Sequence, residues 1–316
     1  MTTKARRLLP TRVYRFYRGG ALLGRLTGEG GGDGSFPEDW LGSVTRANNP
    51  GREEPDAGLS RLDDGTLLAD AIAADPQPWL GARHVERFGP TTGLLVKLLD
   101  AAERLPVHAH PDRQFAEEQF GSPFGKTEAW IVVATRGEGS EVWVGLRERV
   151  EAETYRRWIE TQDRDALLGS LNHVPVEAGD VLYVPAGVPH AIGAGVLIAE
   201  LQEPTDFSLV CEWEGFPIEP GDSHLGLGWD VALGALDLDA HAPITRLPDE
   251  ARTFFWADEL VEPAGRFAVL LVLAGKGAVN GEPARAGDRF AVPAATEELA
   301  ASGSLQVLRC LAPEPR

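Results

Sequence analysis

The chain has 316 residues, 43% hydrophobic and 25% charged, and its 48 acidic residues outnumber the 30 basic ones to give a formal charge of -18 at pH 7. This composition is typical of a globular protein with a sizeable core. The negative charge argues against a nucleic-acid partner, because such binding depends on lysine and arginine neutralising phosphates. No apolar run approaches the roughly 20 residues of a membrane span, and no apolar segment follows the N-terminal charges as in a secretion signal. We therefore expect a cytoplasmic protein with neither a membrane nor a nucleic-acid partner.

The N-terminal segment is basic. Seven lysine and arginine residues precede the first acidic residue, and we favour a solvated first strand over a small anion-attracting edge. These residues are Lys4, Arg6, Arg7, Arg12, Arg15, Arg18 and Arg25. Farther along, the apolar spacing between Leu62 and Leu80 predicts helix, interrupted at Pro76 and Pro78.

From Thr92 onward the pattern changes to short apolar runs bounded by glycine, proline and aspartate, as is typical of a β-sandwich or β-barrel. The runs are GLLVKLLD, AWIVVATR, EVWVGL, DVLYVPA and GVLIAEL. The stretch from about 147 to 171 differs, because it is rich in Glu, Arg, Ala and Leu and lacks proline between Arg147 and Leu171. It predicts helices inserted among the strands. The expected fold class is all-β with helical insertions.

An internal repeat suggests two related β units. The tripeptides Ala-Gly-Asp at 178–180 and Val-Pro-Ala at 184–186 recur at 286–288 and 292–294. We expect residues 1–235 to form one domain, with N-terminal strands and the helical insert, and residues 236–316 to form a second. In the second copy, Arg266 and Glu298 stand where the first has Glu128 and His190, so the C-terminal unit is expected to be metal-free and structural.

Four residues of the first unit form a candidate metal site. His108 and His110 lie two apart in a predicted strand, so their side chains share one face. Glu128 opens the next strand, and His190 ends the Pro-Ala-Gly-Val-Pro-His run that follows the Gly179-Asp180 strand. Three imidazoles and one carboxylate predict a site for Zn²⁺, Mn²⁺, Fe²⁺, Co²⁺ or Ni²⁺, with open positions for water or substrate.

These motifs resemble the cupin superfamily, with its His-x-His…Glu and Gly…Pro-x-Gly…His patterns. Over about 93–206 the chain is similar to class I mannose-6-phosphate isomerases, especially their short bacterial form. The segments that carry this likeness are LLVKLLDAAERLPVHAHPD, GKTEAWIVV and LLGSLNHVPVEAGDVLYVPAGVPHAIGAGVLIAELQ, with the following Thr-Asp. The resemblance implies two cupin-type β-barrels (jelly rolls), with the helical insert lying between the two motifs of the first barrel.

The resemblance also implies roles for individual residues. The family's metal ligands are Gln, His, Glu and His, and His110, Glu128 and His190 match the last three. His108 stands where the family has glutamine, and imidazole is a competent ligand there. Lys126 matches a lysine that faces the substrate, and we assign it with Glu200, the candidate base, to catalysis. Lys97 also matches a family lysine, but an exposed strand lysine is an equal alternative.

A second departure concerns the substrate. The family carries an arginine a few residues after the aspartate that corresponds to Asp206, whereas no arginine occurs here between Asp206 and Glu212. Arginine offers a permanent charge and a fork that matches phosphate. Its loss leaves three kinds of substrate open: a sugar phosphate, an unphosphorylated sugar and an acidic sugar.

The resemblance predicts a metal-dependent aldose–ketose isomerase that converts mannose 6-phosphate to fructose 6-phosphate, or acts on a related sugar, through a cis-enediolate. Zinc is the expected metal and a small-molecule sugar or sugar phosphate the expected partner. Two alternatives remain at this stage: an oxidative cupin using manganese or iron, and a metal-containing sugar-binding protein without catalysis. The sequence does not separate a monomer from a homodimer.

Overall fold

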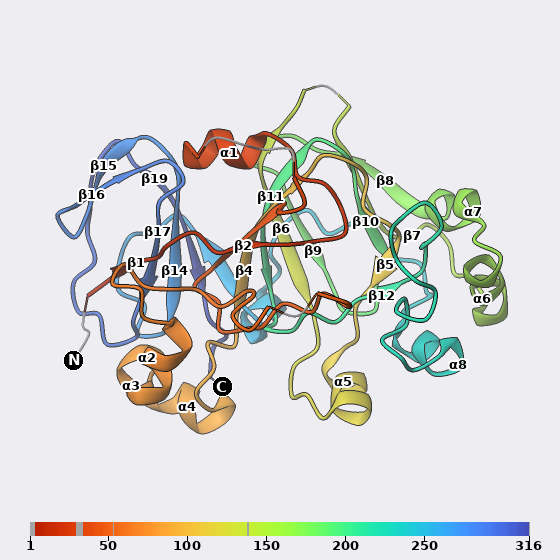
Figure 1. Ribbon diagram of the computed structural model, residues 1–316, viewed down its shortest axis with the longest axis horizontal. Coiled ribbons are helices and arrows are strands. Elements are labelled where there is room, and N and C mark those ends of the chain that lie inside the picture. The colour runs from red at the N-terminus through yellow and green to blue at the C-terminus, as the bar shows by residue number, and fades with distance from the viewer. Residues whose placement is uncertain (1–3, 30–33, 53, 138, 316) are drawn as a thin grey trace.

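The protein consists of three stacked β-sheet layers with short helices at their edges (Figure 1). The computed structural model describes residues 4–29, 34–52, 54–137 and 139–315. Within these ranges no helix is long and apolar enough to cross a membrane. The expectation of a mainly β protein with a few helices is confirmed, whereas the two-barrel arrangement stays a prediction.

The middle layer is a six-stranded antiparallel sheet. Its order is β2 (Arg12–Val13), β3 (Glu38–Leu41), β4 (Leu95–Ala101), β11 (Val196–Gln202), β6 (Glu128–Thr135) and β9 (Val181–Val184). Every residue of β4 and β11 is buried. Both faces of this sheet are covered, so most residues of these two strands are apolar, and Lys97 and Glu200 are buried among them.

A five-stranded sheet covers one face of the middle layer. Its order is β12 (Leu209–Val210), β5 (His108–Ala109), β10 (His190–Ile192), β7 (Glu141–Leu146) and β8 (Leu171–Pro175). Between the two sheets, Trp130 and Ile198 of the middle layer share an apolar cluster with Val144 and Ile192 of the facing one. This cluster fills one part of the space between the sheets, and polar side chains occupy the rest.

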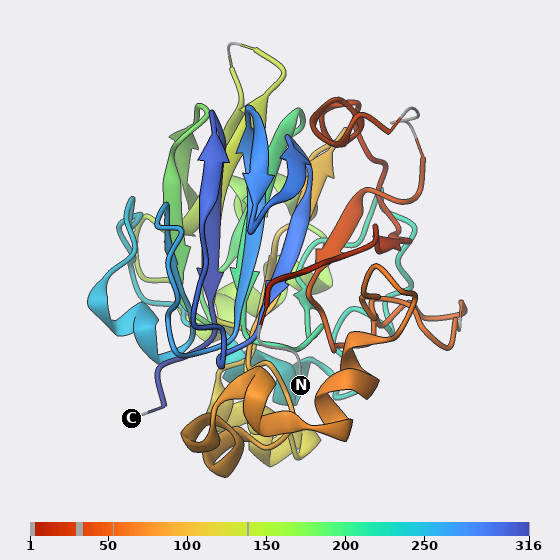
Figure 2. The same ribbon diagram turned by 90° about the vertical axis from the view of Figure 1, so that its left-hand side faces the viewer.

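The C-terminal sheet covers the other face (Figure 2). Its order is β1 (Arg6–Arg7), β17 (Arg289–Val292), β14 (Ala268–Ala274), β19 (Gln306–Leu311) and β13 (Trp256–Asp258), and a small sheet of β16 (Glu282–Arg285), β15 (Lys276–Val279) and β18 (Ala301–Gly303) lies beside it. The largest apolar cluster joins this sheet to the middle layer through residues such as Leu98, Leu201 and Val269. Because β1 pairs with β17, the N-terminal segment contributes a strand here, and the domain boundary at residue 235 stays a prediction.

The helices occupy the connections between strands. They are α1 (Leu22–Thr27), α2 (Leu68–Ala74), α3 (Pro76–Leu80), α4 (Ala82–Phe88), α5 (Arg113–Phe120), α6 (Ala152–Glu160), α7 (Arg164–Gly169), α8 (Trp229–Ala232), η1 (Leu233–Ala235) and η2 (Asp249–Thr253). Pro76 is the first residue of α3, where its missing N–H needs no partner. Helices α6 and α7 lie between β7 and β8, at the right-hand side of Figure 1.

The sequence repeat forms the same turn twice. Asp180 accepts a hydrogen bond from the amide of Glu177, and Asp288 accepts one from the amide of Arg285. The glycines at 179 and 287 both have positive φ, which favours glycine. The turns precede β9 and β17, so the two Ala-Gly-Asp motifs have equivalent local structures.

Candidate metal centre

Three histidines converge between the middle sheet and its five-stranded neighbour. His108 on β5 and His190 on β10 are register partners, and His110 follows His108 by two residues and so faces the same side. In the described part of the chain, these three form the one group of three or more potential ligands, with ligand atoms within 4.8 Å of one another. The geometry thus brings together the three histidines singled out in the sequence.

The hydrogen bonds of these histidines direct their free nitrogens toward one point. Each Nδ1 lies 2.8 Å from a backbone carbonyl, of Pro106 for His108, Phe207 for His110 and Val188 for His190. A carbonyl only accepts, so each Nδ1 carries the proton and each Nε2 presents a lone pair.

Two of these lone pairs face each other. The Nε2 atoms of His108 and His190 are 3.0 Å apart, an arrangement that a cation bound beside them would relieve. Burial, followed by the neighbouring histidines and Lys126, lowers the pKa of His108 well below its ordinary value. Burial and Lys126 lower the pKa of His110 to about 3. Neutral imidazoles with inward lone pairs are the form that binds metal.

Glu128 supplies a carboxylate beside the histidines. One oxygen, Oε2, is 3.2 Å from His110 Nε2, and the other, Oε1, is 3.3 Å from His190 Nε2. Oε1 also accepts a 2.9 Å hydrogen bond from Trp130 Nε1, whereas Oε2 is buried and accepts none. Burial by itself would raise the pKa of Glu128, but Lys126 and the histidines hold it well below its usual range. Three imidazole nitrogens and one carboxylate oxygen fit a divalent transition metal.

The inner face of the middle sheet carries a row of charged residues on four neighbouring strands. Glu38 on β3, Lys97 on β4, Glu200 on β11 and Glu128 on β6 all point toward the same side, because Glu38 lies opposite Leu99, and Glu200 lies opposite both Lys97 and Trp130. Residues of the other face pack against the C-terminal sheet. Because side chains alternate between the two faces of a strand, one face of the sheet carries this charged row, which we call the charged wall, and the other face is apolar.

Two lysines connect this row. Lys97 Nζ is 3.5 Å from Glu200 Oε1, and Lys126 Nζ is 3.3 Å from Glu128 and 3.9 Å from Glu200. Glu200 is only 3% exposed. Burial, together with the charge of Glu128 and against the effect of Lys97, raises the pKa of Glu200 to about 7. Of the two predicted catalytic residues, Lys126 contacts the histidine cluster, with Nζ 2.9 Å from His110 Nε2, and Glu200 lies beside Lys126.

A cavity of about 310 Å³ opens beside the charged wall. Glu128, Lys126, Glu200, Lys97 and His108 line it, together with segments of the chain at 14–17, 48–50 and 217–225. This volume is at the small end of the range for small-molecule sites.

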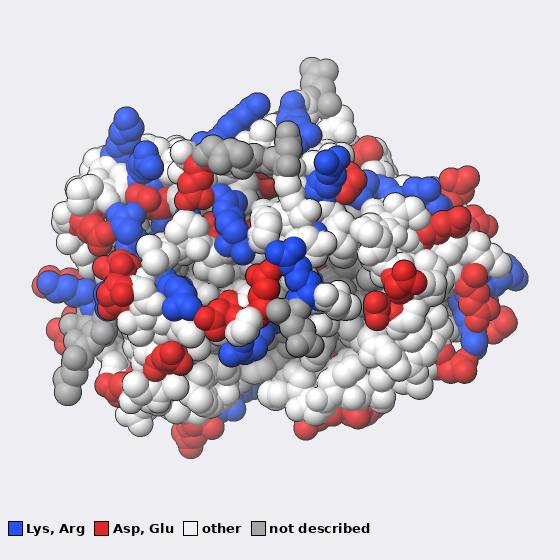
Figure 3. Space-filling view, viewed as in Figure 1, with Lys and Arg blue, Asp and Glu red and all other residues white. Residues whose placement is uncertain are grey.

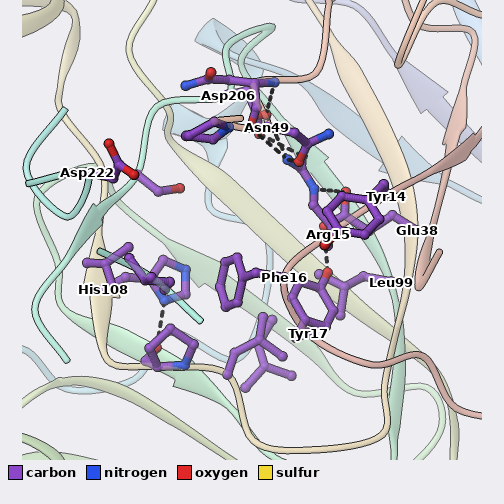
Figure 4. Close-up of a pocket in the computed structure, with 18 of the residues that line it drawn as sticks. Tyr14, Arg15, Phe16, Tyr17, Glu38, Asn49, Leu99, His108, Asp206 and Asp222 are labelled. Atoms are coloured by element: carbon purple, nitrogen blue, oxygen red, sulfur yellow. Dashed lines mark hydrogen bonds and ion pairs between the residues drawn. The ribbon is translucent and has the colours of Figure 1, made fainter. Parts of the chain in front are cut away.

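Arg15 is a site residue that the sequence interpretation missed. It is 8% exposed and lines the cavity, so the expectation of a solvated first strand is wrong at this position. Its guanidinium forms a two-bond pair with Asp206, at 2.8 and 3.0 Å, and lies 3.0 Å from Glu38 (Figure 4). Glu38 also accepts hydrogen bonds from Tyr17 and Trp40. The partners of Arg15 are distant in sequence, and no local motif marks them.

Outside the cavity, positive and negative side chains alternate over the face seen in Figure 3. Exposed arginines pair with nearby carboxylates, as Arg52 does with Glu54 and Arg149 with Glu151. Around the histidines, in contrast, charged residues such as Lys97, Lys126 and Glu128 are buried.

Gly125 allows the loop before Glu128 to approach the loop after His110. A Cβ at Gly125 would lie 2.6 Å from Pro111 O and from the carbonyl carbon of Asp112. Gly125→Ala is therefore expected to lower the free energy of unfolding by about 1–3 kcal/mol, measured by urea unfolding. Gly169→Ala is the control, because nothing lies within 4 Å of its added Cβ. If the two variants were equally stable, the close approach at Gly125 would be wrong.

Part of the chain is similar in sequence to known mannose-6-phosphate isomerases. The chain is 42% identical over 135 residues to mannose-6-phosphate isomerase from Streptococcus mutans, covering 42% of this chain and 41% of that protein. It is 36% identical over 132 residues to mannose-6-phosphate isomerase ManA from Bacillus subtilis, covering 40% of each. These matches span less than half the length of the curated relatives. No family model matches the chain.

The fold is similar over nearly the whole chain. A mannose 6-phosphate isomerase structure from Bacillus subtilis superposes with a TM-score of 0.75 at 22% identity, covering 97% of this chain and 99% of that one. A variant of phosphomannose isomerase from Salmonella typhimurium gives a TM-score of 0.74 at 16% identity, covering 98% of this chain and 100% of that one. In the sequence of part of its length and in its fold, the chain is thus similar to the class I mannose-6-phosphate isomerases, and the resemblance inferred from its motifs is confirmed.

Proposed function

We propose that the chain is a metal-dependent aldose–ketose isomerase of the mannose-6-phosphate isomerase type. The observation that carries this proposal is the convergence of three imidazole Nε2 atoms and the Glu128 carboxylate beside a cavity that Lys126 and Glu200 also line. Sequence similarity to named isomerases over about two fifths of the chain favours isomerisation over the oxidative and the non-catalytic alternatives.

We assign the metal to His108, His110, Glu128 and His190, and expect zinc. A bound divalent cation would act as a Lewis acid toward the sugar oxygen on which negative charge develops. The ligands and the cavity lining all come from residues before 226. This placement supports a metal-binding unit at 1–235, and we propose that 236–316 is a metal-free, structural unit.

Glu200 is the proposed base. Isomerisation moves a proton between C1 and C2 of the sugar through a cis-enediolate, so one group must take the proton and return it. A buried carboxylate with a pKa of about 7 can do both near neutral pH. Lys126 lies between Glu200 and Glu128, where its ammonium can donate to a sugar hydroxyl or carbonyl oxygen. Lys97 positions Glu200 from the neighbouring strand.

The test is reconstitution with Zn²⁺, Mn²⁺, Fe²⁺, Co²⁺ or Ni²⁺, followed by elemental analysis and an isomerase assay with mannose 6-phosphate and mannose. We expect about one metal ion per chain, and ketose formation that a chelator abolishes and metal restores. Failure to bind metal would contradict the site. Stoichiometric metal without conversion of either sugar would contradict the activity, and oxygen uptake with a redox metal would favour the oxidative alternative.

A further inference from the structure

We propose that the cavity is built for an uncharged, unphosphorylated aldose and discriminates against a sugar phosphate. This inference rests on the proposed function, because it names the substrate class of the same site. It is carried by the charges of the cavity wall and by the partners that those charges already have.

Carboxylates outnumber cations in the cavity lining. Among the described residues that line it, three are lysine or arginine and six are aspartate or glutamate. The cations are Arg15, Lys97 and Lys126, and the carboxylates are Glu38, Glu128, Glu200, Asp206, Glu219 and Asp222. A bound divalent cation does not reverse this balance, so the lining as a whole does not attract an anion.

Each of the three cations is already paired within the wall. Arg15 contacts Glu38 and Asp206 at 3.0 and 2.8 Å. Lys97 is 3.5 Å from Glu200 and 3.9 Å from Asp206. Both side chains are nearly inaccessible, with 9% and 3% of their surface exposed.

Lys126 Nζ is 2.9 Å from His110 Nε2, 3.3 Å from Glu128 and 3.9 Å from Glu200. A phosphate that used Arg15 or Lys97 would have to displace a buried carboxylate and leave it without its partner, and one that approached Lys126 would lie beside two carboxylates. Breaking one side of a buried pair is strongly unfavourable. A sugar hydroxyl, in contrast, can donate to a carboxylate and accept from an ammonium without separating the pair.

Among the described lining residues, the one that pairs with His108 on the neighbouring strand is uncharged. Val210 on β12 is the register partner of His108 and lines the cavity. It belongs to the segment between Asp206 and Glu212 in which arginine is absent. Val210 therefore presents an apolar surface next to a proposed metal ligand.

Two arginines near the cavity are also paired. Arg52 stacks on Tyr14, a cavity residue, but contacts Glu54 at 2.6 Å. Arg104 stacks on Phe216, and its guanidinium donates two hydrogen bonds, of 2.5 and 2.8 Å, to the Glu212 carboxylate.

The outer part of the cavity repels a dianion. Glu219 and Asp222 both line it and both are exposed. Figure 4 shows Asp222 across the cavity from Tyr14 and Arg15. Like charges at an entrance disfavour an anionic ligand relative to a neutral one, and so discriminate between two otherwise similar sugars.

The experiment measures binding of D-mannose and D-mannose 6-phosphate to the zinc-loaded protein by calorimetry. We expect mannose to bind at least as tightly as its phosphate, and inorganic phosphate at 10-fold excess over the sugar to leave mannose binding unchanged. In Val210→Arg the ratio of the two dissociation constants is expected to shift at least tenfold in favour of the phosphate. Val210→Gln is the matched control, since it adds a polar side chain without charge and should shift the ratio by less than threefold.

A second variant tests the same inference at exposed positions. The double change Glu219→Gln and Asp222→Asn should shift the ratio at least threefold toward the phosphate, and added salt should reduce that effect. This variant keeps the inference testable if Val210→Arg does not fold.

Tighter binding of mannose 6-phosphate than of mannose in the wild-type protein would overturn the inference, as would the absence of binding by either sugar. Turnover is assayed on the same samples. Conversion of mannose 6-phosphate alone would overturn the inference and leave the proposed isomerase standing. Conversion of neither sugar would contradict the isomerase, while the binding ratio would still decide which ligand the cavity prefers.

Discussion

Replacing His110 by alanine is expected to abolish isomerisation and to weaken zinc binding by at least 100-fold. His110 is 1% exposed, and its Nδ1 is fixed by the Phe207 carbonyl, so that Nε2 points at Glu128 and Lys126. Removal of groups that merely orient a metal ligand typically costs 10–100-fold in affinity, and removal of a ligand costs more. The measurement is competition for zinc with a chelator of known affinity, together with kcat for the preferred sugar.

His173→Ala is the matched control for this loss. His173 on β8 is half exposed and pairs with Glu141 at the surface, away from the histidine cluster. We expect His173→Ala to keep full metal content and activity.

Glu128→Gln keeps the shape of the side chain but removes its charge, and like His110→Ala it should weaken metal binding. Folded variants that bound one zinc per chain with wild-type affinity would show that the ligand assignment is wrong.

The core of the candidate site could be predicted because its residues belong to local patterns. His108 and His110 are two apart in one strand, and strand periodicity alone places them on one face. The approach of His190 depends on sheet pairing, and the resemblance to a known family supplied that long-range information. For Lys97 the sequence did not decide between an exposed lysine and a site residue. In the structure Lys97 is 2% exposed and lines the cavity.

The remaining wall of the cavity could not be predicted from local pattern. Arg15 lies 191 residues from Asp206 in the sequence, yet their side chains form a two-bond pair. Arg15 is one of seven basic residues in the N-terminal segment, and these are equally compatible with a solvated strand. The presence of several charges does not show which of the side chains points into the protein. Glu38 and Trp40 lie two apart, as His108 and His110 do, but neither residue type marks a metal or a sugar by itself. Similarly, the stretch around Asp222 has no regular secondary structure and becomes part of the cavity only through the tertiary fold.

Glu200→Gln is expected to reduce kcat by about 10²–10⁴-fold, the usual contribution of a positioned base, while leaving zinc content unchanged. Glutamine fills the same space between Lys97 and Lys126 but cannot accept the proton. Metal content by elemental analysis and kcat under saturating sugar give the two readouts. Simultaneous loss of zinc would show that Glu200 acts on the metal site, and unchanged kcat would show that another group is the base.

The pH profile provides an independent test of the same role. The base must be ionised, so kcat/KM should fall about tenfold per pH unit below the pKa of Glu200, which burial raises to about 7 in the metal-free protein. This decrease forms the acidic limb of the pH profile. A divalent cation nearby favours the ionised carboxylate and moves the acidic limb to lower pH. Lys97→Met should move the limb of the zinc-loaded enzyme back to higher pH, because Lys97 is the leading group that lowers the pKa of Glu200. In Glu200→Gln the limb should disappear from the residual activity. An acidic limb that stayed in place in both variants would assign the titration, and the proton transfer with it, to a different residue.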